Sequence, residues 1–213
     1  MSLCTIVGMG PGLGLSVARR FAEEKFDIAM IARNETHLQD HSKVLNEYGT
    51  KVSYAVADAG NIDKLTGALS KFSDETDVLV YNTAVIEKSS LTIDPQKLIE
   101  HLQVDVVGGL VSAQQIVPSM LGKGEGTILF TGGGFAHEPN PNYVSLSIGK
   151  AGLWNLGKML AKKYRQYHIH VAVVSIYGKV EQGTRYDPDI IAHKFWNLHV
   201  QPESQWQKEV YIR

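Results

Sequence analysis

The chain has 213 residues, of which 44% are hydrophobic and 20% charged, the composition of a globular protein with one large core. Its formal net charge of -1 excludes a global field that attracts nucleic acid or an anionic membrane, and its single cysteine, Cys4, excludes a disulfide framework. We find no signal-peptide pattern and no apolar run long enough to span a membrane, so we expect one cytoplasmic domain over residues 1–213.

Short apolar runs alternate with longer amphipathic stretches. The runs are nearly continuous and rich in Val and Ile, which predicts parallel strands buried on both faces, at residues 3–7, 27–31, 52–56, 78–80, 127–130 and 170–174. The stretches between them predict helices over residues 13–24, 35–48, 62–72, 95–121 and 143–167. The tail adds a short helix around residues 190–199 and a last strand at residues 209–212. This alternation predicts a doubly wound α/β sheet.

The first predicted strand ends in a glycine cluster, GMGPGLG at residues 8–14, and a helix follows at once. Such a turn lets the backbone approach a pyrophosphate, and the N–H groups and dipole of the helix N-terminus attract it. A tight turn without a ligand is the alternative, but the strand–loop–helix context favours a dinucleotide. The residues predicted to contact it are Gly8, Gly10, Gly12, Leu13 and Gly14.

The end of the second strand is where an acidic residue would hold the 2′-hydroxyl of the adenosine ribose and select NAD. The chain has no carboxylate there and places Arg33, whose guanidinium suits a 2′-phosphate. NADP is therefore predicted in preference to NAD, with a solvated Arg33 at a helix start as the alternative. Asp58, Asn82 and Ala84 follow the third and fourth strands and are expected to contact the adenine and its ribose.

These features resemble the short-chain dehydrogenase/reductase family, from Ile6 to about Val180. The resemblance rests on the glycine loop, Asp58, residues 82–84, Lys150 and residues 177–180. It implies a Rossmann-type sheet of about seven mostly parallel strands with helices on both faces, hydride transfer with NAD(P), and a homodimer or homotetramer. Residues 177–180 (YGKV) resemble the family's Pro-Gly motif beside the nicotinamide, which implies that Gly178 and Val180 contact the cofactor.

The family's usual active site is Asn, Ser, Tyr and Lys, and this chain keeps only the lysine. Asp105 stands at the asparagine position, Gly133 at the serine position and Leu146 at the tyrosine position. The resemblance implies that Lys150 holds the nicotinamide ribose and supplies a positive charge. Asp105 either ties a water molecule to Lys150, as the asparagine does, or holds the lysine charge directly.

A displaced tyrosine, Tyr143, precedes Lys150 by seven residues. At about 100° per helical residue, seven residues leave an offset of about 20°, so both side chains share one face. This Tyr-x6-Lys spacing is locally similar to that of the enoyl-acyl carrier protein reductases. We therefore predict Tyr143 as proton donor and Lys150 as its electrostatic partner, with Thr131 supplying a hydroxyl near the missing serine and residues 132–134 offering backbone N–H groups to an oxyanion.

The expected function is an NADP-dependent reduction of a small-molecule carbonyl or enone, with no nucleic-acid or membrane partner. The alternative is a catalytically degenerate NADP-binding sensor or partner protein, with Tyr143 as ordinary packing. No metal site is predicted, because His37 and His41 lie four apart on a helix without a third ligand nearby in sequence.

Overall fold

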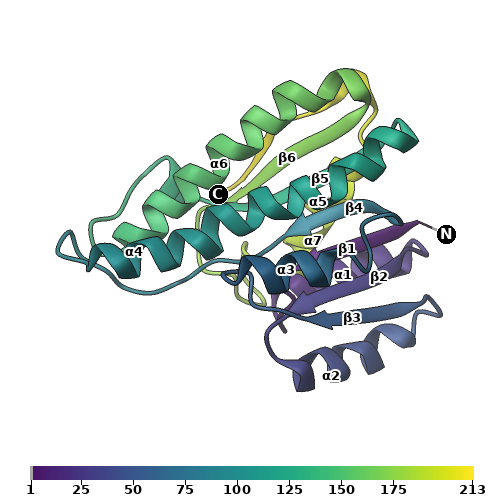
Figure 1. The fold of residues 1–213 in the computed structure, drawn as a ribbon, viewed down its shortest axis with the longest axis horizontal. Helices are drawn as coiled ribbons and strands as arrows, with labels where there is room; N and C mark the ends of the chain where they lie inside the picture. The colour runs from purple at the N-terminus through teal and green to yellow at the C-terminus, as the bar shows by residue number, and fades with distance from the viewer. Residues whose placement is uncertain (1) are drawn as a thin grey trace.

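The computed structural model describes residues 2–213 as one sheet with helices on both faces (Figure 1). The strands are β1 (Leu3–Val7), β2 (Asp27–Ala32), β3 (Val52–Val56), β4 (Thr76–Tyr81), β5 (Gly126–Gly133), β6 (Ile169–Ile176) and β7 (Glu209–Ile212). They form a 7-stranded sheet in the order β3-β2-β1-β4-β5-β6-β7, and all neighbouring pairs are parallel. This confirms the predicted Rossmann-type sheet.

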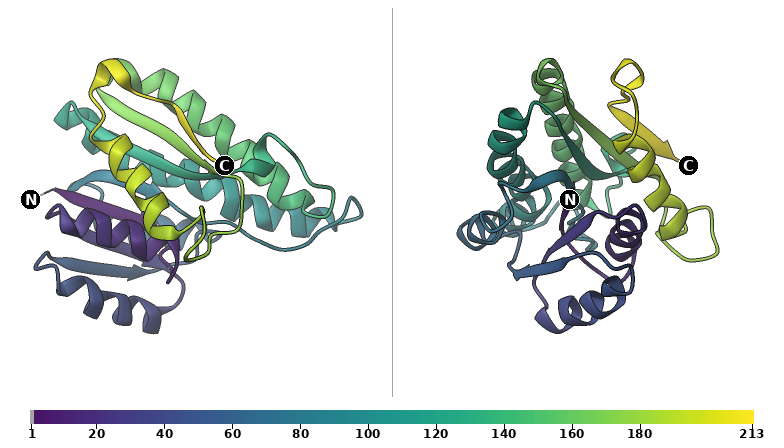
Figure 2. Two further views of the ribbon diagram at one scale, coloured as in Figure 1. Left: turned by 180° about the vertical axis from the view of Figure 1, so that it is seen from behind. Right: turned by 90° about the vertical axis from the view of Figure 1, so that its right-hand side faces the viewer.

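The helices divide into two layers. They are α1 (Leu13–Glu23), α2 (Glu35–Asn46), α3 (Ile62–Leu69), α4 (Pro95–Leu102), α5 (Gly108–Lys123), α6 (Val144–Tyr164) and α7 (Pro188–His199). Short helical turns are η1 (Gln103–Val107), η2 (Gly134–Ala136), η3 (Arg165–Tyr167) and η4 (Glu203–Gln205). Helices α1, α2 and α7 cover one face of the sheet and α3, α5 and α6 the other (Figure 2), and their buried side chains form two separate cores.

The strands have continuous apolar runs because successive side chains enter opposite cores. Cys4 and Ile6 of β1 pack in the core beneath α1 and α7, whereas Val7 packs in the core beneath α3 and α5. The prediction that residues 52–56 are buried on both faces is wrong. This strand, β3, lies at the edge of the sheet, and its Val56 is 47% exposed.

The long helix predicted over residues 95–121 is interrupted by the π-helical turn η1, between α4 and α5. Gly108 N–H donates to the carbonyl of Gln103, five residues back, instead of to Val104. The Val104 carbonyl instead accepts hydrogen bonds from two side chains at the end of β4, the Tyr81 hydroxyl and Thr83 Oγ1. The interruption therefore comes from tertiary contacts with β4 and not from a local breaker.

The expectation that no apolar run is long enough to span a membrane also needs correction. Residues Pro95–Lys123 are helical throughout and, by length and composition alone, pass that test. In this fold α5 packs against α3 and β4, and its apolar side chains belong to the core between sheet and helices. The same composition is typical of a core helix in an α/β sheet.

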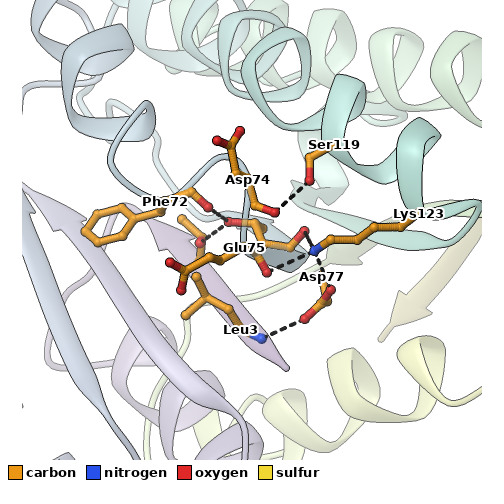
Figure 3. Close-up of polar contacts among 9 residues, drawn as sticks. Leu3, Phe72, Asp74, Glu75, Asp77, Ser119 and Lys123 are labelled. Atoms are coloured by element: carbon orange, nitrogen blue, oxygen red, sulfur yellow. Dashed lines mark hydrogen bonds and ion pairs between the residues drawn. The ribbon is translucent and has the colours of Figure 1, made fainter. Parts of the chain in front are cut away.

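The amino ends of the central strands are closed by a polar network around Lys123, at the end of α5 (Figure 3). Lys123 Nζ donates to Asp77 Oδ1 at 2.8 Å and to the Glu75 carbonyl at 3.1 Å. The other oxygen of Asp77 accepts from Leu3 N–H at 2.9 Å, and Ser119 Oγ donates to the Asp74 carbonyl at 2.8 Å. These contacts join β1, β4 and α5 at one end of the sheet and leave the carboxyl ends of the strands, at the opposite end, open to a ligand.

Candidate active site

Two adjoining clefts open at the carboxyl ends of the strands, near the point between β1 and β4 where the strand order reverses, which is where doubly wound sheets bind ligands. The smaller has a volume of about 440 Å³ and the larger about 780 Å³. Asn82, Thr83, Ala84 and Ile86 line both clefts, so the two form one continuous depression. Its length and position suit an extended dinucleotide with its adenosine in the smaller cleft.

The glycine loop fits closely against the end of β4. Gly8 has a φ of +89°, and a Cβ atom there would lie 2.6 Å from Thr83 Cγ2 and 2.7 Å from the Asn82 carbonyl carbon. A Cβ on Gly14 would lie 3.2 Å from the Gly8 oxygen and 3.3 Å from Asn82 Nδ2. The loop and strand therefore touch backbone to backbone, which only glycine permits at position 8.

Gly10 and Gly12 differ from these two, because an added Cβ would meet no atom within 4 Å at either position. Gly12 is also the N-cap of α1 and has no side chain to offer its first-turn amides. Leu13, the first residue of α1, lines the larger cleft. The loop therefore combines a closely packed base with an open side and uncapped amides, an arrangement that fits a phosphate group.

At the adenosine end, Arg33 and Asp58 line the smaller cleft together. Arg33 Nη1 lies 3.9 Å from Asp58 Oδ2, and the two side chains are 79% and 44% exposed. An exposed ion pair of this length is weak, which leaves the guanidinium available to another anion. The same cleft is lined by His37, which the sequence led us to consider only as a possible metal ligand. The signal that was missed is its place one turn after Arg33, at the start of α2.

A chain of hydrogen bonds crosses the sheet from α6 to the glycine loop. Lys150 Nζ donates to the Thr131 carbonyl at 2.7 Å, and Thr131 Oγ1 donates to Asn82 Oδ1 at 2.9 Å. Asn82 Nδ2 in turn donates to the Gly8 carbonyl at 3.1 Å. Thr131 lines the larger cleft, but its hydroxyl proton points to Asn82 and not to the position of the missing serine.

Asp105 and Lys150 are both buried, but only Lys150 lines the larger cleft, and Asp105, predicted as part of the active site, lines neither cleft. Asp105 Oδ1 accepts from Val85 N–H at 2.7 Å, whereas its Oδ2 is buried without a hydrogen-bond partner. No direct ion pair joins Asp105 to Lys150 in the described chain, since the ammonium donates to Thr131. Gly149 makes room for the carboxylate, because a Cβ there would overlap Asp105.

Burial shifts both of these titrations. Desolvation raises the pKa of Asp105 to about 6, against the opposing effects of the Val85 N–H and the Lys150 charge. Desolvation lowers the pKa of Lys150 to about 8, against the opposing effect of Asp105. Each charge therefore stabilises the charged form of the other group, whereas burial destabilises the charged forms of both.

Four residues line the larger cleft, so the displaced tyrosine and the lysine share one cleft: Tyr143, Leu146, Gly133 and Lys150. Tyr143 is the N-cap of α6, with φ −138° and ψ 52°, so the helical-phase argument applies to Leu146 but not to Tyr143. Its ring instead packs on Phe135, with ring centroids 5.5 Å apart and an angle of 30°. Leu146 is largely buried in the wall of the cleft.

The opposite wall of the larger cleft comes from the segment after β6. Gly178 and Val180, predicted to contact the cofactor, line this cleft, and so does Tyr177, which replaces the family's proline. The Tyr177 ring stacks on His137 at 6.2 Å and 5°, and its hydroxyl is buried without a hydrogen-bond partner. Across residues 2–213, no group of three His, Cys, Asp or Glu side chains is placed to hold a metal ion.

Comparison with known proteins places the chain in a family. The model of the family described as "short chain dehydrogenase" matches residues 3–183. An uncharacterized oxidoreductase of Thermotoga maritima is 26% identical over 177 residues, which cover 81% of this chain and 69% of that protein. The match covers 65% of one further curated relative and 59% of another, so the chain is clearly shorter than these proteins.

Solved structures agree on the fold. A short-chain dehydrogenase from Rhodopseudomonas palustris has a TM-score of 0.90 at 24% identity, with 100% of this chain and 98% of that chain covered. The L-sorbose reductase of Gluconobacter frateurii, complexed with NADPH and L-sorbose, has a TM-score of 0.90 at 19% identity, with 99% and 94% covered. On the family match and the architecture together, the chain belongs to the short-chain dehydrogenase family of oxidoreductases.

Proposed function

We propose that the protein is an NADP-dependent reductase that transfers hydride to a small-molecule carbonyl or enone. The observation that carries this proposal is that Tyr143 and Lys150 line one cleft, which continues into the cleft of the glycine loop. A proton donor and a fixed positive charge beside a nucleotide cleft are what such a reduction needs from a protein. Lys150, Asp105 and Thr131 would form the fixed part of this site, and Tyr143 the proton-transferring part.

The residues present fit a dinucleotide. The open side of the glycine loop would hold the pyrophosphate, Asp58, Asn82 and Ala84 the adenosine, and Lys150, Gly178 and Val180 the nicotinamide half. When bound, the nicotinamide supplies a hydride. NADP is preferred in this proposal because the exposed Arg33 guanidinium, with His37 beside it in the same cleft, can meet a 2′-phosphate.

In the proposed reduction of an aldehyde or ketone, the new C–H bond would form at the carbonyl carbon with the supplied hydride, the C=O π pair would move to the oxygen, and Tyr143 would give that oxygen its hydroxyl proton. For an enone, the new C–H bond would form at the β-carbon and the displaced pair would give an enolate. The Tyr143 proton would convert this enolate to an enol, which tautomerises to the ketone in water. The Lys150 charge stabilises the anion that develops on that oxygen and on the phenol. With a pKa of about 8, Lys150 is mostly protonated at neutral pH, and the nearby Asp105 carboxylate helps to keep it so. Tyr143 then regains a proton from water.

The direct test is reduction of a panel of aldehydes, ketones and enones with NADPH and NADH, followed by Tyr143→Phe. Loss of general-acid catalysis typically costs about 10²–10⁴-fold, so we expect kcat to fall by at least about 100-fold. Tyr167→Phe, which removes an exposed hydroxyl beyond α6, is the matched control. Full activity in Tyr143→Phe contradicts the assignment of the donor.

Cofactor choice has its own test. In Arg33→Ala the dissociation constant for NADPH should rise by about 10-fold or more while that for NADH stays nearly constant, as expected when a charge-assisted contact of about 1.5–3 kcal/mol is lost. A wild-type protein that binds NADH more tightly than NADPH contradicts the NADP preference.

The second candidate is a non-catalytic NADP-binding protein, a sensor or partner subunit. It is favoured by Gly133 and Leu146, which leave neither a serine nor a tyrosine at the family's usual positions. Tight NADPH binding with no turnover of any substrate in the panel would support it against the reductase.

A further inference from the structure

Ser89, in the loop between β4 and α4, reaches across to the start of α6. It forms an isolated parallel bridge with Tyr143. Ser89 N–H donates to the Asn142 carbonyl at 2.9 Å, and Val144 N–H donates to the Ser89 carbonyl at 3.3 Å. The two bonds therefore attach Ser89 to the residues immediately before and after Tyr143.

The Ser89 side chain adds a third bond at the same place. Its Oγ accepts from Ser145 N–H at 3.1 Å. This amide is the second of α6, which an N-cap side chain ordinarily satisfies, but the N-cap here is Tyr143 and makes no such bond. Ser89 thus caps the active-site helix from a distant segment of the chain.

A buried polar relay holds Ser89 in turn. Ser89 Oγ lies 3.2 Å from Ser145 Oγ, which lies 2.9 Å from His101 Nδ1 on α4. His101 Nε2 lies 3.7 Å from a carboxylate oxygen of Glu87. A proton on Nε2, facing Glu87, leaves Nδ1 to accept from Ser145, and Ser145 Oγ then accepts from the Ser89 hydroxyl. Each hydroxyl in the relay finds both a donor and an acceptor.

Tyr143 depends on these contacts because its backbone is not helical. Its N–H donates to the Asn140 carbonyl at 2.9 Å and its carbonyl accepts from Ser147 N–H at 2.8 Å. With the Ser89 bridge added, the backbone is fixed on both sides of the residue. Packing on Phe135 then restricts the ring.

We propose that Ser89 is a positioning residue that holds Tyr143 in its proton-donating place by capping α6 from outside; this rests on the proposed function. The same loop begins with Asn82 and Ala84, which line both clefts. One short stretch of chain therefore joins the cofactor contacts at its start to the Tyr143 bridge at its end. Tyr143 is placed by the segment that contacts the cofactor, in addition to its own helix.

The test compares Ser89→Ala, Ser89→Thr and Ser90→Ala. Ser90 is the matched control because it is exposed and its hydroxyl bonds Thr92 at 2.7 Å, away from α6. We expect Ser89→Ala to lower kcat by about tenfold, which corresponds to about 1.4 kcal/mol. The NADPH dissociation constant should change by less than about twofold, a difference well below 1 kcal/mol. Ser89→Thr, which keeps the hydroxyl, should recover most of kcat, and Ser90→Ala should resemble the wild type.

A second measurement does not require turnover. In protein labelled with ¹³C at tyrosine ring carbons, the Tyr143 signal is assigned by its absence in Tyr143→Phe. We expect it to shift or broaden in Ser89→Ala and to stay unchanged in Ser90→Ala. An unmoved signal in Ser89→Ala overturns the inference, even if the protein turns over no substrate.

The two proposals fail in different ways. If Tyr143→Phe abolishes turnover while Ser89→Ala leaves kcat unchanged, the positioning role is wrong and the proposed function stands. If Tyr143→Phe is fully active, the assignment of Tyr143 as proton donor fails and the positioning role fails with it. A tenfold loss in Ser89→Ala that adds nothing in the Tyr143→Phe background supports both.

Discussion

Gly133 lacks the hydroxyl that the family's serine provides at this position of the active site. Although it stands where the family has a serine, the site has space for one. A Cβ at Gly133 would lie 3.5 Å from Lys150 Cγ and 3.7 Å from the Ile176 carbonyl, which is ordinary contact. Crowding therefore does not explain why position 133 lacks a hydroxyl, since a serine would fit there.

Gly133→Ser should therefore fold normally and add a hydroxyl beside Lys150. A new hydrogen bond to the developing oxyanion, a kind of donor whose removal typically costs about 2.7–4 kcal/mol, should raise kcat/KM for small carbonyl substrates by up to about 100-fold. The measurement is steady-state kinetics on the substrate panel, with the thermal midpoint as a control for folding. Gly132→Ser, whose Cβ would lie 2.6 Å from Val173 Cγ1, should destabilise the protein instead.

Asp105 gives the protein a defined dependence of stability on pH. Its folded-state pKa, about 6, lies above the ordinary value of a carboxyl, so the folded state binds its proton more tightly than the unfolded chain does. The contribution of Asp105 to the free energy of unfolding is therefore highest at acid pH and falls as the pH rises to about 6. Lys150 has a lowered pKa and acts in the opposite sense, above about pH 8.

In Asp105→Asn the acid-side dependence should disappear. We expect the stability of the wild type relative to this variant to decrease between about pH 4 and pH 6, by roughly 1–3 kcal/mol for a shift of this size. Urea unfolding at several pH values measures it, with Asp63→Asn on the exposed first turn of α3 as the control. Parallel pH curves for wild type and Asp105→Asn would refute the burial of this carboxyl as the cause.

Sequence reasoning at the residue scale succeeded where the determinant is local. The spacing of the glycine loop predicted a strand–turn–helix junction, and Gly8 and Gly14 are the positions where a side chain does not fit freely. The hydrogen-bond partners of Thr131 and Asp105 were not predictable, because they lie tens of residues away on other strands and loops. The role of Ser89 was hidden for the same reason.

The π-helical turn η1 sets the packing at the scale of the secondary-structure elements. It lets Tyr81 and Thr83 bond to a helical carbonyl, and it carries Asp105, whose carboxylate accepts from Val85 N–H. Gly108 enables the contact, since a Cβ there would overlap the Tyr81 hydroxyl and lie 2.8 Å from the Ala59 carbonyl oxygen.

Gly108→Ala should destabilise the protein by about 1–3 kcal/mol, the usual cost of overpacking a buried contact. Gly122→Ala is a matched control in the same helix, because its Cβ would meet nothing within 4 Å. Alanine has the higher helix propensity, so the control should gain about 0.5–1 kcal/mol. Chemical unfolding of the two variants measures the difference, and equal changes would contradict a role for Gly108 in shaping the turn.

Element boundaries followed from the sequence as far as periodicity determines them. The residues of β1 and β3 match the predicted runs, and β4, β5 and β6 extend the predicted ones at both ends. Periodicity did not reveal the break within residues 95–121, because it arises from contacts with Tyr81 and Thr83, which lie outside that segment of the sequence. It also placed Tyr143 inside α6, although the loop bridge at Ser89 holds it outside.

At the scale of the whole molecule, α5 and α6 belong to the same helix layer (Figure 1), and each has exposed apolar side chains. Val107 and Leu110, at the start of α5, are 38% and 37% exposed, and Ile148 and Met159 on α6 are 43% and 58% exposed. Apolar side chains gathered on neighbouring helices are typical of a surface that pairs with another copy. We propose that these side chains form a dimer interface, which is one of the two assemblies, homodimer or homotetramer, that the family resemblance implies.

We therefore expect sedimentation velocity to show a dimer, and Leu110→Glu combined with Ile148→Glu to shift it to monomer. Burying a charge without a partner in an interface typically costs several kcal/mol, enough to separate the subunits at micromolar concentration. Ile190→Glu, at a residue 51% exposed on α7 in the other helix layer, is the control and should leave the dimer intact. A monomeric wild type would refute the pairing.

The hydrogen-bond chain from Lys150 through Thr131 and Asn82 to Gly8 spans β5, β4 and β1, three adjacent strands. At about 4.8 Å per strand, its ends are held roughly 10 Å apart across the sheet. The glycine loop and the Lys150 ammonium therefore keep a fixed separation, which the proposed function requires between the pyrophosphate and the nicotinamide of the cofactor. A one-residue slip in β5 would turn the Thr131 side chain to the other face of the sheet and would break its contacts with Asn82 and Lys150 together.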